Sequence, residues 1–286
     1  MKRREFIQYL SFALLDFKSV FNHSIYSNKD SKNLQILLNP GHNKAVFKQG
    51  YGCYMKGVGY EYIINTKIAE KTQEFLHEQG LNATLTRDEI DYLPSIETYL
   101  KHNKEDLLEK ISEFRKNNTG NHRMPLEEAV IQLSILKWAE SQPIDLIINI
   151  HINDTVEEYR GKFSGFSVTT SPENGSFEKS KLLAHSIYDS LIMSFKPSNN
   201  KADLVLVKQN NIKKYIPGFM MNDYLMLGHA LHRTQIPSVL IECGFIDEKY
   251  REDNLAISDE RVQNEYAHMI SEGIILYNNN SQLKPL

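Results

Sequence analysis

The chain has 286 residues and a formal net charge of −3 at pH 7, so it is long enough for one substantial domain with a real core. Its apolar fraction of 41% excludes an intrinsically disordered chain, and its near-neutral charge argues against a nucleic-acid binder, which would carry a basic excess. No apolar run reaches the roughly 18 residues that a membrane span needs, so we expect no membrane span.

The first 33 residues resemble an export leader followed by a linker. Arg3 and Arg4 are adjacent, and a mostly apolar stretch follows at 6–15, which is the arrangement of a twin-arginine signal. The stretch is short, Gln8 interrupts it, and no clean Ala-x-Ala cleavage site follows. An N-terminal amphipathic helix is therefore the alternative. We expect an exported, periplasmic or wall-associated protein, or a cytoplasmic one if this segment is not a signal.

From residue 34 onward, apolar strands alternate with amphipathic helices. Short apolar or alternating runs predict strands, and longer runs with apolar residues on one face predict helices. The strands are expected at 34–39, 82–86, 145–151, 163–170 and 238–244, and the helices at 60–78, 176–195 and 260–277. This alternation predicts a single α/β domain over 34–280, with a mostly parallel, twisted sheet covered by helices on both faces. Residues 281–286 form a tail.

The segment 88–135 does not fit this alternation. It is rich in charged residues and contains an Asn-rich stretch at 117–121. We expect a helical insert of one or two helices lying outside the sheet. Its role is open between a lid or partner-binding element and an elaboration without function.

The ends of three expected strands carry the candidate chemistry, because ligands of open α/β sheets bind beyond the carboxyl ends of the strands. His42 follows the first strand, His151 ends the third, and Glu242 lies in the last, while Glu61 opens the helix at 60–78 after a glycine-rich loop. Two histidines and one carboxylate form a catalytic zinc set that leaves a fourth position for water. A second carboxylate nearby can accept the proton of that water.

Each of these residues also has a purely structural explanation. A histidine at a strand end is commonly a polar surface residue, and Glu61 could stabilise a helix N-terminus through the helix dipole. Glu242 is the strongest single candidate, because a carboxylate inside an apolar run is costly to bury without a partner. The case for a metal site therefore depends on all four residues occurring together.

Other potential ligands are weaker candidates. Cys53 and Cys243 are too few for a disulfide framework and fit no cysteine-based zinc motif, so we interpret them as independent buried thiols, with a disulfide between them as the alternative. The remaining histidines lie in expected helices or loops and are treated as non-ligands: His77, His102, His122, His185, His229, His232 and His268.

Five short motifs occur in a fixed order between about 34 and 277. They read LNPGHN at 38–43, GYEY at 59–62, TRD at 86–88, NIHIN at 149–153 and VLIECGF at 239–245. In this order they resemble the zinc-dependent N-acetylmuramoyl-L-alanine amidases of the cell-separation and sporulation type. The resemblance implies that His42, Glu61 and His151 hold one Zn²⁺ ion, with Glu242 as the general base.

The same resemblance implies a substrate and partners. The enzyme would cleave the amide bond between N-acetylmuramic acid and L-alanine in peptidoglycan, for wall remodelling or daughter-cell separation. An activating protein is a candidate partner, and we expect a monomer. The alternatives are a zinc peptidase that cuts within the stem peptide, a catalytically inactive wall-binding or regulatory module, and a cytoplasmic enzyme that recycles muropeptides.

Two residues depart from the family pattern. Asn39 stands where the family has an aspartate, which we interpret as a partner that orients a ligating histidine. Asn43 stands where the family has a glycine, and asparagine tolerates unusual backbone angles better than most residues. Arg87, in the third motif, is interpreted as structural, paired with a carboxylate near the site.

Overall fold

The computed structural model describes residues 34–48, 52–117, 124–155, 157–200, 204–209, 212–221, 233–250 and 255–283. The expected export leader, 1–33, lies outside these ranges. The elements in chain order are β1 (Gln35–Pro40), α2 (Lys44–Lys48), β2 (Tyr54–Met55), β3 (Gly59–Tyr60), α3 (Glu61–Glu78), β4 (Asn82–Leu85), α4 (Pro94–Asn117), α5 (Leu126–Glu140), β5 (Leu146–Asn153), the 3₁₀ helix η1 (Glu157–Tyr159), β6 (Ser167–Thr170), α6 (Phe177–Leu191), β7 (Leu204–Gln209), β8 (Ile212–Pro217), β9 (Phe219–Met221), β10 (Ser238–Phe245), β11 (Lys249–Tyr250), β12 (Leu255–Ala256) and α7 (Glu260–Leu283). Within the described ranges, no helix combines the length and the apolar character that crossing a membrane requires.

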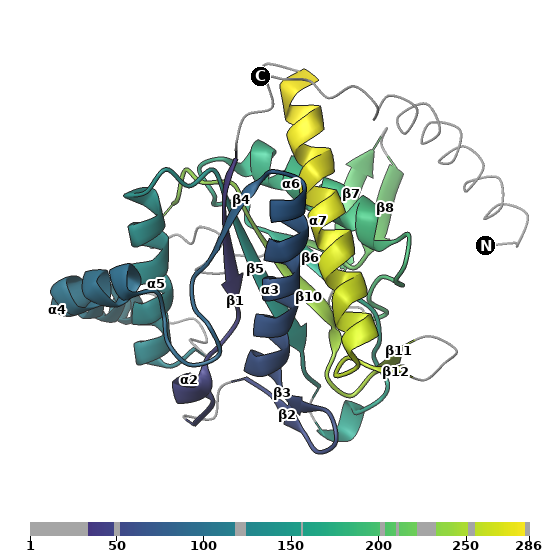
Figure 1. The fold of residues 1–286 in the computed structure, drawn as a ribbon, viewed down its shortest axis with the longest axis horizontal. Helices are drawn as coiled ribbons and strands as arrows, with labels where there is room; N and C mark the ends of the chain where they lie inside the picture. The colour runs from purple at the N-terminus through teal and green to yellow at the C-terminus, as the bar shows by residue number, and fades with distance from the viewer. Residues whose placement is uncertain are drawn as a thin grey trace, which may run out of the picture. The chain divides into compact units, whose positions relative to one another are not determined.

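One mixed sheet of eight strands forms the centre of the fold, in the order β4-β1-β5-β10-β6-β9-β7-β8 (Figure 1). The strands β4, β1, β5 and β10 pair in parallel, whereas β6 runs antiparallel to β10 and β8 antiparallel to β7. The predicted α/β class with a mostly parallel sheet is therefore confirmed. The strand expected at 163–170 is shorter, β6, and the strands β7, β8 and β9 were not expected from the sequence.

Helices cover both faces of the sheet, as the sequence predicted. Successive side chains of a strand point to opposite faces, so Ile36 and Leu38 of β1 pack with α3, α6 and α7 on one side. On the other side, Leu37 of β1 and Ile147 of β5 pack against Ile135 of α5. Because the central strands are buried on both faces, they read as nearly continuous apolar runs.

The insert at 88–135 supplies two helices, but the second helix does not lie outside the sheet as expected. The C-terminal half of α5 contributes Ile135 and Leu136 to the apolar cluster that covers Leu37 and Ile147 of the sheet. The other side of α5 packs against α4 in a separate apolar cluster of Leu107, Ile111, Ala129, Val130 and Leu133. The helix α5 is thus a layer of the core, and α4 covers its outer side.

Candidate metal centre

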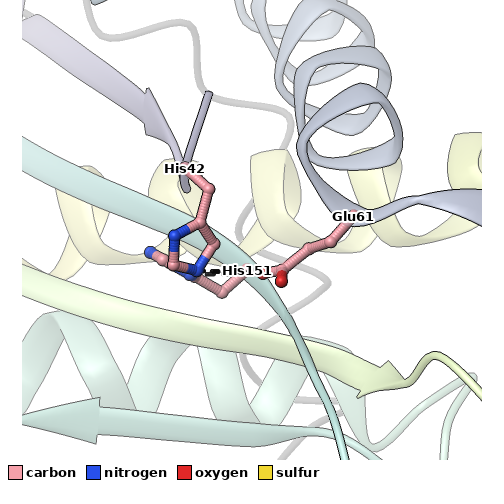
Figure 2. A group of neighbouring side chains, drawn as sticks. All are labelled: His42, Glu61 and His151. Carbon is pink, nitrogen blue, oxygen red and sulfur yellow. Dashed lines mark ion pairs between the residues drawn. The ribbon is translucent and has the colours of Figure 1, made fainter. Parts of the chain in front are cut away.

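A sharp turn follows β1 and turns the first candidate ligand toward the end of the sheet. Gly41 N donates a hydrogen bond to Ile150 O at 2.8 Å, which extends the contact between β1 and β5. The next residue, His42, has φ 56°, the one positive value among the non-glycine residues that the structure describes. Histidine enters this left-handed region more readily than most residues. The turn directs the imidazole of His42 toward His151 and Glu61 (Figure 2).

Three of the four predicted site residues converge at this end of the sheet. His42, Glu61 and His151 each offer one ligand atom within 4.8 Å of the other two. Glu61 Oε1 lies 3.5 Å from both His42 Nε2 and His151 Nδ1, and the dashed lines of Figure 2 mark these two pairs. The two imidazole planes meet at 89° with ring centroids 5.0 Å apart. Both rings thus turn a nitrogen toward one shared carboxylate oxygen.

Four hydrogen bonds anchor the carboxylate of Glu61. It is 3% exposed, and its Oε2 accepts hydrogen bonds from Cys53 N at 3.0 Å and from Cys53 Sγ at 3.3 Å. Its Oε1 accepts from Asn65 Nδ2 at 3.2 Å and from Ile152 N at 3.3 Å. Glu61 is also the first residue of α3, where the helix dipole stabilises a negative charge. These contacts fix the side chain before any ligand binds.

The charge states of these groups follow from burial and from one another. Burial by itself would raise the pKa of Glu61, but His42, His151 and the Cys53 thiol together hold this pKa at about 2. Burial lowers the pKa of His42 to about 4, against the attraction of Glu61. Burial and the charge of Glu61 raise the pKa of Cys53, so the thiol stays protonated and donates its hydrogen bond. At neutral pH the site therefore holds an ionised carboxylate beside a neutral His42 imidazole.

This donor set fits a divalent transition metal. Two imidazole nitrogens and one carboxylate oxygen are a recognised set of three protein ligands for catalytic zinc. Neutral histidine and ionised carboxylate are the forms that bind metal, and the anchored Glu61 keeps Oε1 between the two histidine nitrogens. The residues that the sequence singled out as metal ligands are therefore the ones that the fold brings together.

Two glycines allow the close approach of the backbone to these side chains. A Cβ atom at Gly41 would lie 2.2 Å from His151 Cε1, which no real side chain tolerates. Gly52 has φ 91°, and a Cβ atom there would lie 3.3 Å from His42 Cγ and 3.5 Å from Glu61 Oε2. Both positions require glycine because the backbone itself forms a wall of the site.

Glu242, the fourth predicted residue, lies one strand away from His151. The parallel strands β5 and β10 pair so that Glu242 and His151 are register partners, and paired residues of neighbouring strands face the same side of a sheet. Burial lowers the pKa of His151, but the hydrogen bond to Glu61 and the charge of Glu242 outweigh this effect and raise the pKa. Glu242 is half-buried and stands outside the group of three potential ligands.

The sequence suggested a histidine partner for the residue at position 39, but the hydrogen bonds of the Asn39 side chain within the described residues go to other partners. Its Oδ1 accepts a hydrogen bond from Thr86 Oγ1 at 2.7 Å, and its Nδ2 donates to Asn149 Oδ1 at 2.8 Å. Asn149 Nδ2 in turn donates to Val239 O at 3.0 Å. These buried amides connect β1 to β5 and β5 to β10, so Asn39 braces the strands that carry the site.

Asn43 and Arg87, the other two residues interpreted from the sequence, also differ in detail from those interpretations. The unusual backbone angle belongs to His42, whereas Asn43 Oδ1 accepts a hydrogen bond from Val46 N at 2.8 Å and so caps α2. Arg87 is structural, as predicted, but its donors bind oxygens that carry no charge. They bond Pro40 O at 3.1 Å, Gly41 O at 2.9 Å and Thr66 Oγ1 at 2.7 Å, which ties the His42 turn to α3.

Sequence reasoning missed the residues that hold Glu61 in place. Asn65 lies one helical turn after Glu61, and this i, i+4 spacing was a signal that could have been used. Cys53 lies in a loop, and nothing in its sequence position predicts a contact with Glu61. Both cysteines are buried, and they form no disulfide with each other, in agreement with their interpretation as independent thiols.

An α/β sheet that gathers two histidines and a glutamate at its carboxyl end, with a second glutamate one strand away, is the arrangement expected of a hydrolase that can hold a metal ion. Comparison with known families then gives the particular assignment: the family model of N-acetylmuramoyl-L-alanine amidase, Amidase_3, matches residues 36–276. The chain belongs to this family of peptidoglycan amidases. Among proteins with curated functions, no sequence matches it significantly.

Solved structures of amidases share the fold. The CwlD amidase of Clostridioides difficile, in complex with the GerS lipoprotein, has 24% identity and a TM-score of 0.55, with 87% of this chain and 100% of that chain covered. Ami1 of Mycobacterium smegmatis has 17% identity and a TM-score of 0.55, with 88% and 100% covered. AmiC2 of Nostoc punctiforme has 19% identity and a TM-score of 0.53, with 86% and 98% covered. At these identities the likeness shows a common fold.

Proposed function

We propose that the protein is a zinc-dependent N-acetylmuramoyl-L-alanine amidase that hydrolyses the amide bond between the lactyl group of N-acetylmuramic acid and L-alanine. The observation that carries this proposal is the convergence of His42, Glu61 and His151 within 4.8 Å at the end of the sheet. Membership in the amidase family supports the choice of the bond.

His42, Glu61 and His151 would hold one zinc ion as its three protein ligands. When bound there, zinc supplies Lewis-acid chemistry, because it makes water more acidic and stabilises negative charge that develops on a carbonyl oxygen. Cys53 and Asn65 keep the Glu61 carboxylate in place through their hydrogen bonds, and such outer contacts set the geometry of a metal ligand.

Glu242 acts as the general base. It accepts a proton from the attacking water and returns this proton to the nitrogen of L-alanine as the carbon–nitrogen bond breaks. Its register position beside His151 and its place outside the ligand group support this role. The products are a glycan with a free lactyl carboxylate and a stem peptide with a free amino terminus, so one water is consumed for each bond broken.

The Glu242→Gln variant separates proton transfer from metal binding. The amide keeps the size of the side chain but cannot accept the proton, so turnover should fall by at least about 100-fold while the zinc content, measured by atomic emission, stays at the wild-type level. The matched variant His151→Ala should lose zinc as well as turnover. Full activity of Glu242→Gln would remove Glu242 from the mechanism, and a zinc-loaded wild type without turnover would favour a wall-binding module.

We propose in addition that the enzyme acts outside the cytoplasm, in wall remodelling or cell separation, with the help of an activating protein. The adjacent Arg3 and Arg4 support export, and the CwlD structure, which contains the GerS lipoprotein, supports a partner. Replacing both arginines by lysine should retain a reporter fusion in the cytoplasm, and unchanged export would contradict the leader assignment. Added envelope proteins should raise the activity of the purified chain, and equal activity would contradict the need for an activator.

A further inference from the structure

The insert carries a buried carboxylate that the proposed mechanism does not use. Glu128 lies in the first turn of α5 and is 1% exposed. Its Oε1 accepts a hydrogen bond from Gln132 Nε2 at 2.5 Å, whereas its Oε2 is buried and has no hydrogen-bond partner in the part of the chain that the structure describes. Burying a carboxylate with an unsatisfied oxygen costs folding free energy, so we expect this side chain to have a function.

The packing of α5 places Glu128 at the level of the metal centre. Glu128 and Ile135 are seven residues apart and share one face of the helix, and Ile135 belongs to the same apolar cluster as Ile147 of β5. Because α5 packs on the sheet and only residues 141–145 separate it from β5, the helix runs antiparallel to that strand. Its N-terminal end therefore lies at the carboxyl end of the strands, where His151 is.

The distances along the two elements agree. At about 1.5 Å per helical residue, Glu128 is about 10 Å from Ile135 toward the carboxyl end of the sheet. At about 3.3 Å per strand residue, His151 is about 13 Å from Ile147 in the same direction. Ile147 and His151 also face the same side of the sheet, because they are four residues apart in one strand. Glu128 and His151 therefore lie at a similar level along the sheet, on a helix and a strand that face each other.

The electrostatics of the two residues support this placement. Burial raises the pKa of Glu128, and the Gln132 hydrogen bond, then the charges of His151 and Arg87, act in the opposite direction. Glu128 is likewise among the acidic groups that counter the effect of burial on the pKa of His151. Each residue thus lies within electrostatic range of the other.

The structure pairs one ring nitrogen of His151 with Glu61. His151 Nδ1 faces Glu61 Oε1 at 3.5 Å, so Nδ1 is the atom that would bind a metal, and Nε2 points away from it across the ring. A ligating histidine generally donates its other N–H to a carboxylate, carbonyl or water, which fixes both the tautomer and the ring orientation. The unsatisfied Oε2 of Glu128 is an acceptor of the required kind.

We propose that Glu128 is a positioning residue of the metal centre: when His151 binds the metal through Nδ1, Glu128 Oε2 accepts the Nε2–H of the same ring and holds the ring in that tautomer. This inference rests on the proposed function of the three ligands. It also gives the insert a role: α5 supports the metal centre from within the core, instead of closing over it as a lid.

Cobalt(II) binding to the purified chain tests the proposal, because the visible absorption of Co²⁺ reports both its affinity and its coordination. The variants are Glu128→Gln and Glu128→Leu, and the matched control is Glu127→Gln, which changes the exposed neighbouring carboxylate in the same helical turn. The Leu variant should bind Co²⁺ about 10- to 100-fold more weakly than the wild type, with an altered spectrum. The Gln variant should lose less, because its amide oxygen still accepts a hydrogen bond. The control should match the wild type.

Thermal unfolding of the metal-free variants separates positioning from a merely structural role. Removing a buried and incompletely paired charge should leave the unfolding midpoint of metal-free Glu128→Leu unchanged or raise it, while the Co²⁺ affinity falls. A merely structural Glu128 would instead give a lower midpoint and a wild-type Co²⁺ affinity in the folded variant. That result, or identical Co²⁺ spectra and affinities in all four proteins, would overturn the proposal. If the folded wild type bound no Co²⁺, the metal centre itself would be refuted, and the role of Glu128 with it.

Discussion

A single methyl group added at Gly41 should disable the metal centre. In the Gly41→Ala variant, the new Cβ would lie 2.2 Å from His151 Cε1 and 2.3 Å from His151 Nδ1, whereas ordinary contact begins at 3.4 Å. The imidazole must therefore move by about 1 Å, a displacement that is enough to cost about 100-fold in rate at a catalytic site. This factor corresponds to about 2.7 kcal/mol. Since Nδ1 is the proposed ligand atom, zinc affinity should fall along with turnover.

Competition with a chromophoric zinc chelator measures the affinity, and amidase turnover is followed on purified peptidoglycan. The control is Gly57→Ala, because Gly57 has φ 87° and a Cβ atom there would meet nothing within 4 Å. This control should lose about 1–2 kcal/mol of stability through backbone strain and keep wild-type zinc affinity. A folded Gly41→Ala protein with wild-type zinc affinity would refute the placement of His151 against this turn.

Three further predictions concern the groups around the site. Asn65→Ala removes a hydrogen bond to Glu61 Oε1 and another to Gly41 O, so zinc affinity should fall by about 10-fold; calorimetric titration that gives an unchanged affinity would contradict the bracing role. Arg87→Lys cannot reproduce the fork of donors that ties the His42 turn to α3, and its free energy of unfolding in urea should fall by about 3 kcal/mol; a loss below 1 kcal/mol would count against this role. In the metal-free protein, burial holds the pKa of His42 at about 4 against its ordinary 6.5. The unfolded chain therefore binds the proton first, and stability falls as the pH drops from 6.5 to 4. His42→Ala should flatten this part of the stability curve, and an equally steep curve would show that His42 is not the group responsible.

The sequence predicted the central strands well because of how they are buried. The strands β1, β5 and β10 are covered on both faces, so each appears as a nearly continuous apolar run. The helix α5 was harder to place for the opposite reason. It is buried between α4 and the sheet, with apolar residues on both sides, and therefore lacks the one-sided apolar stripe of a surface helix. The charged residues of α4, which precede α5 in the same segment, also favoured the prediction that the whole segment lies outside the sheet.

The candidate ligands were predictable because each stands at the end of an element whose direction the sequence already indicated. His42 and His151 follow or end buried strands, and Glu61 opens a helix. The supporting residues were not predictable, because their roles depend on contacts between segments that are distant in sequence. Cys53 reaches Glu61 from a loop, and Glu128 belongs to a segment that the sequence pattern set apart from the sheet. Only packing brings these groups to the site.

Hydrolysis of intact peptidoglycan in H₂¹⁸O by the zinc-loaded protein tests the central claim most directly. Mass spectrometry of the products locates the oxygen that the attacking water delivers. Amidase action would place ¹⁸O in the lactyl carboxylate of the glycan and release unlabelled stem peptides that begin with L-alanine. Label in a carboxylate of the stem peptide, with the lactyl amide intact, would contradict the proposed reaction and show a peptidase instead.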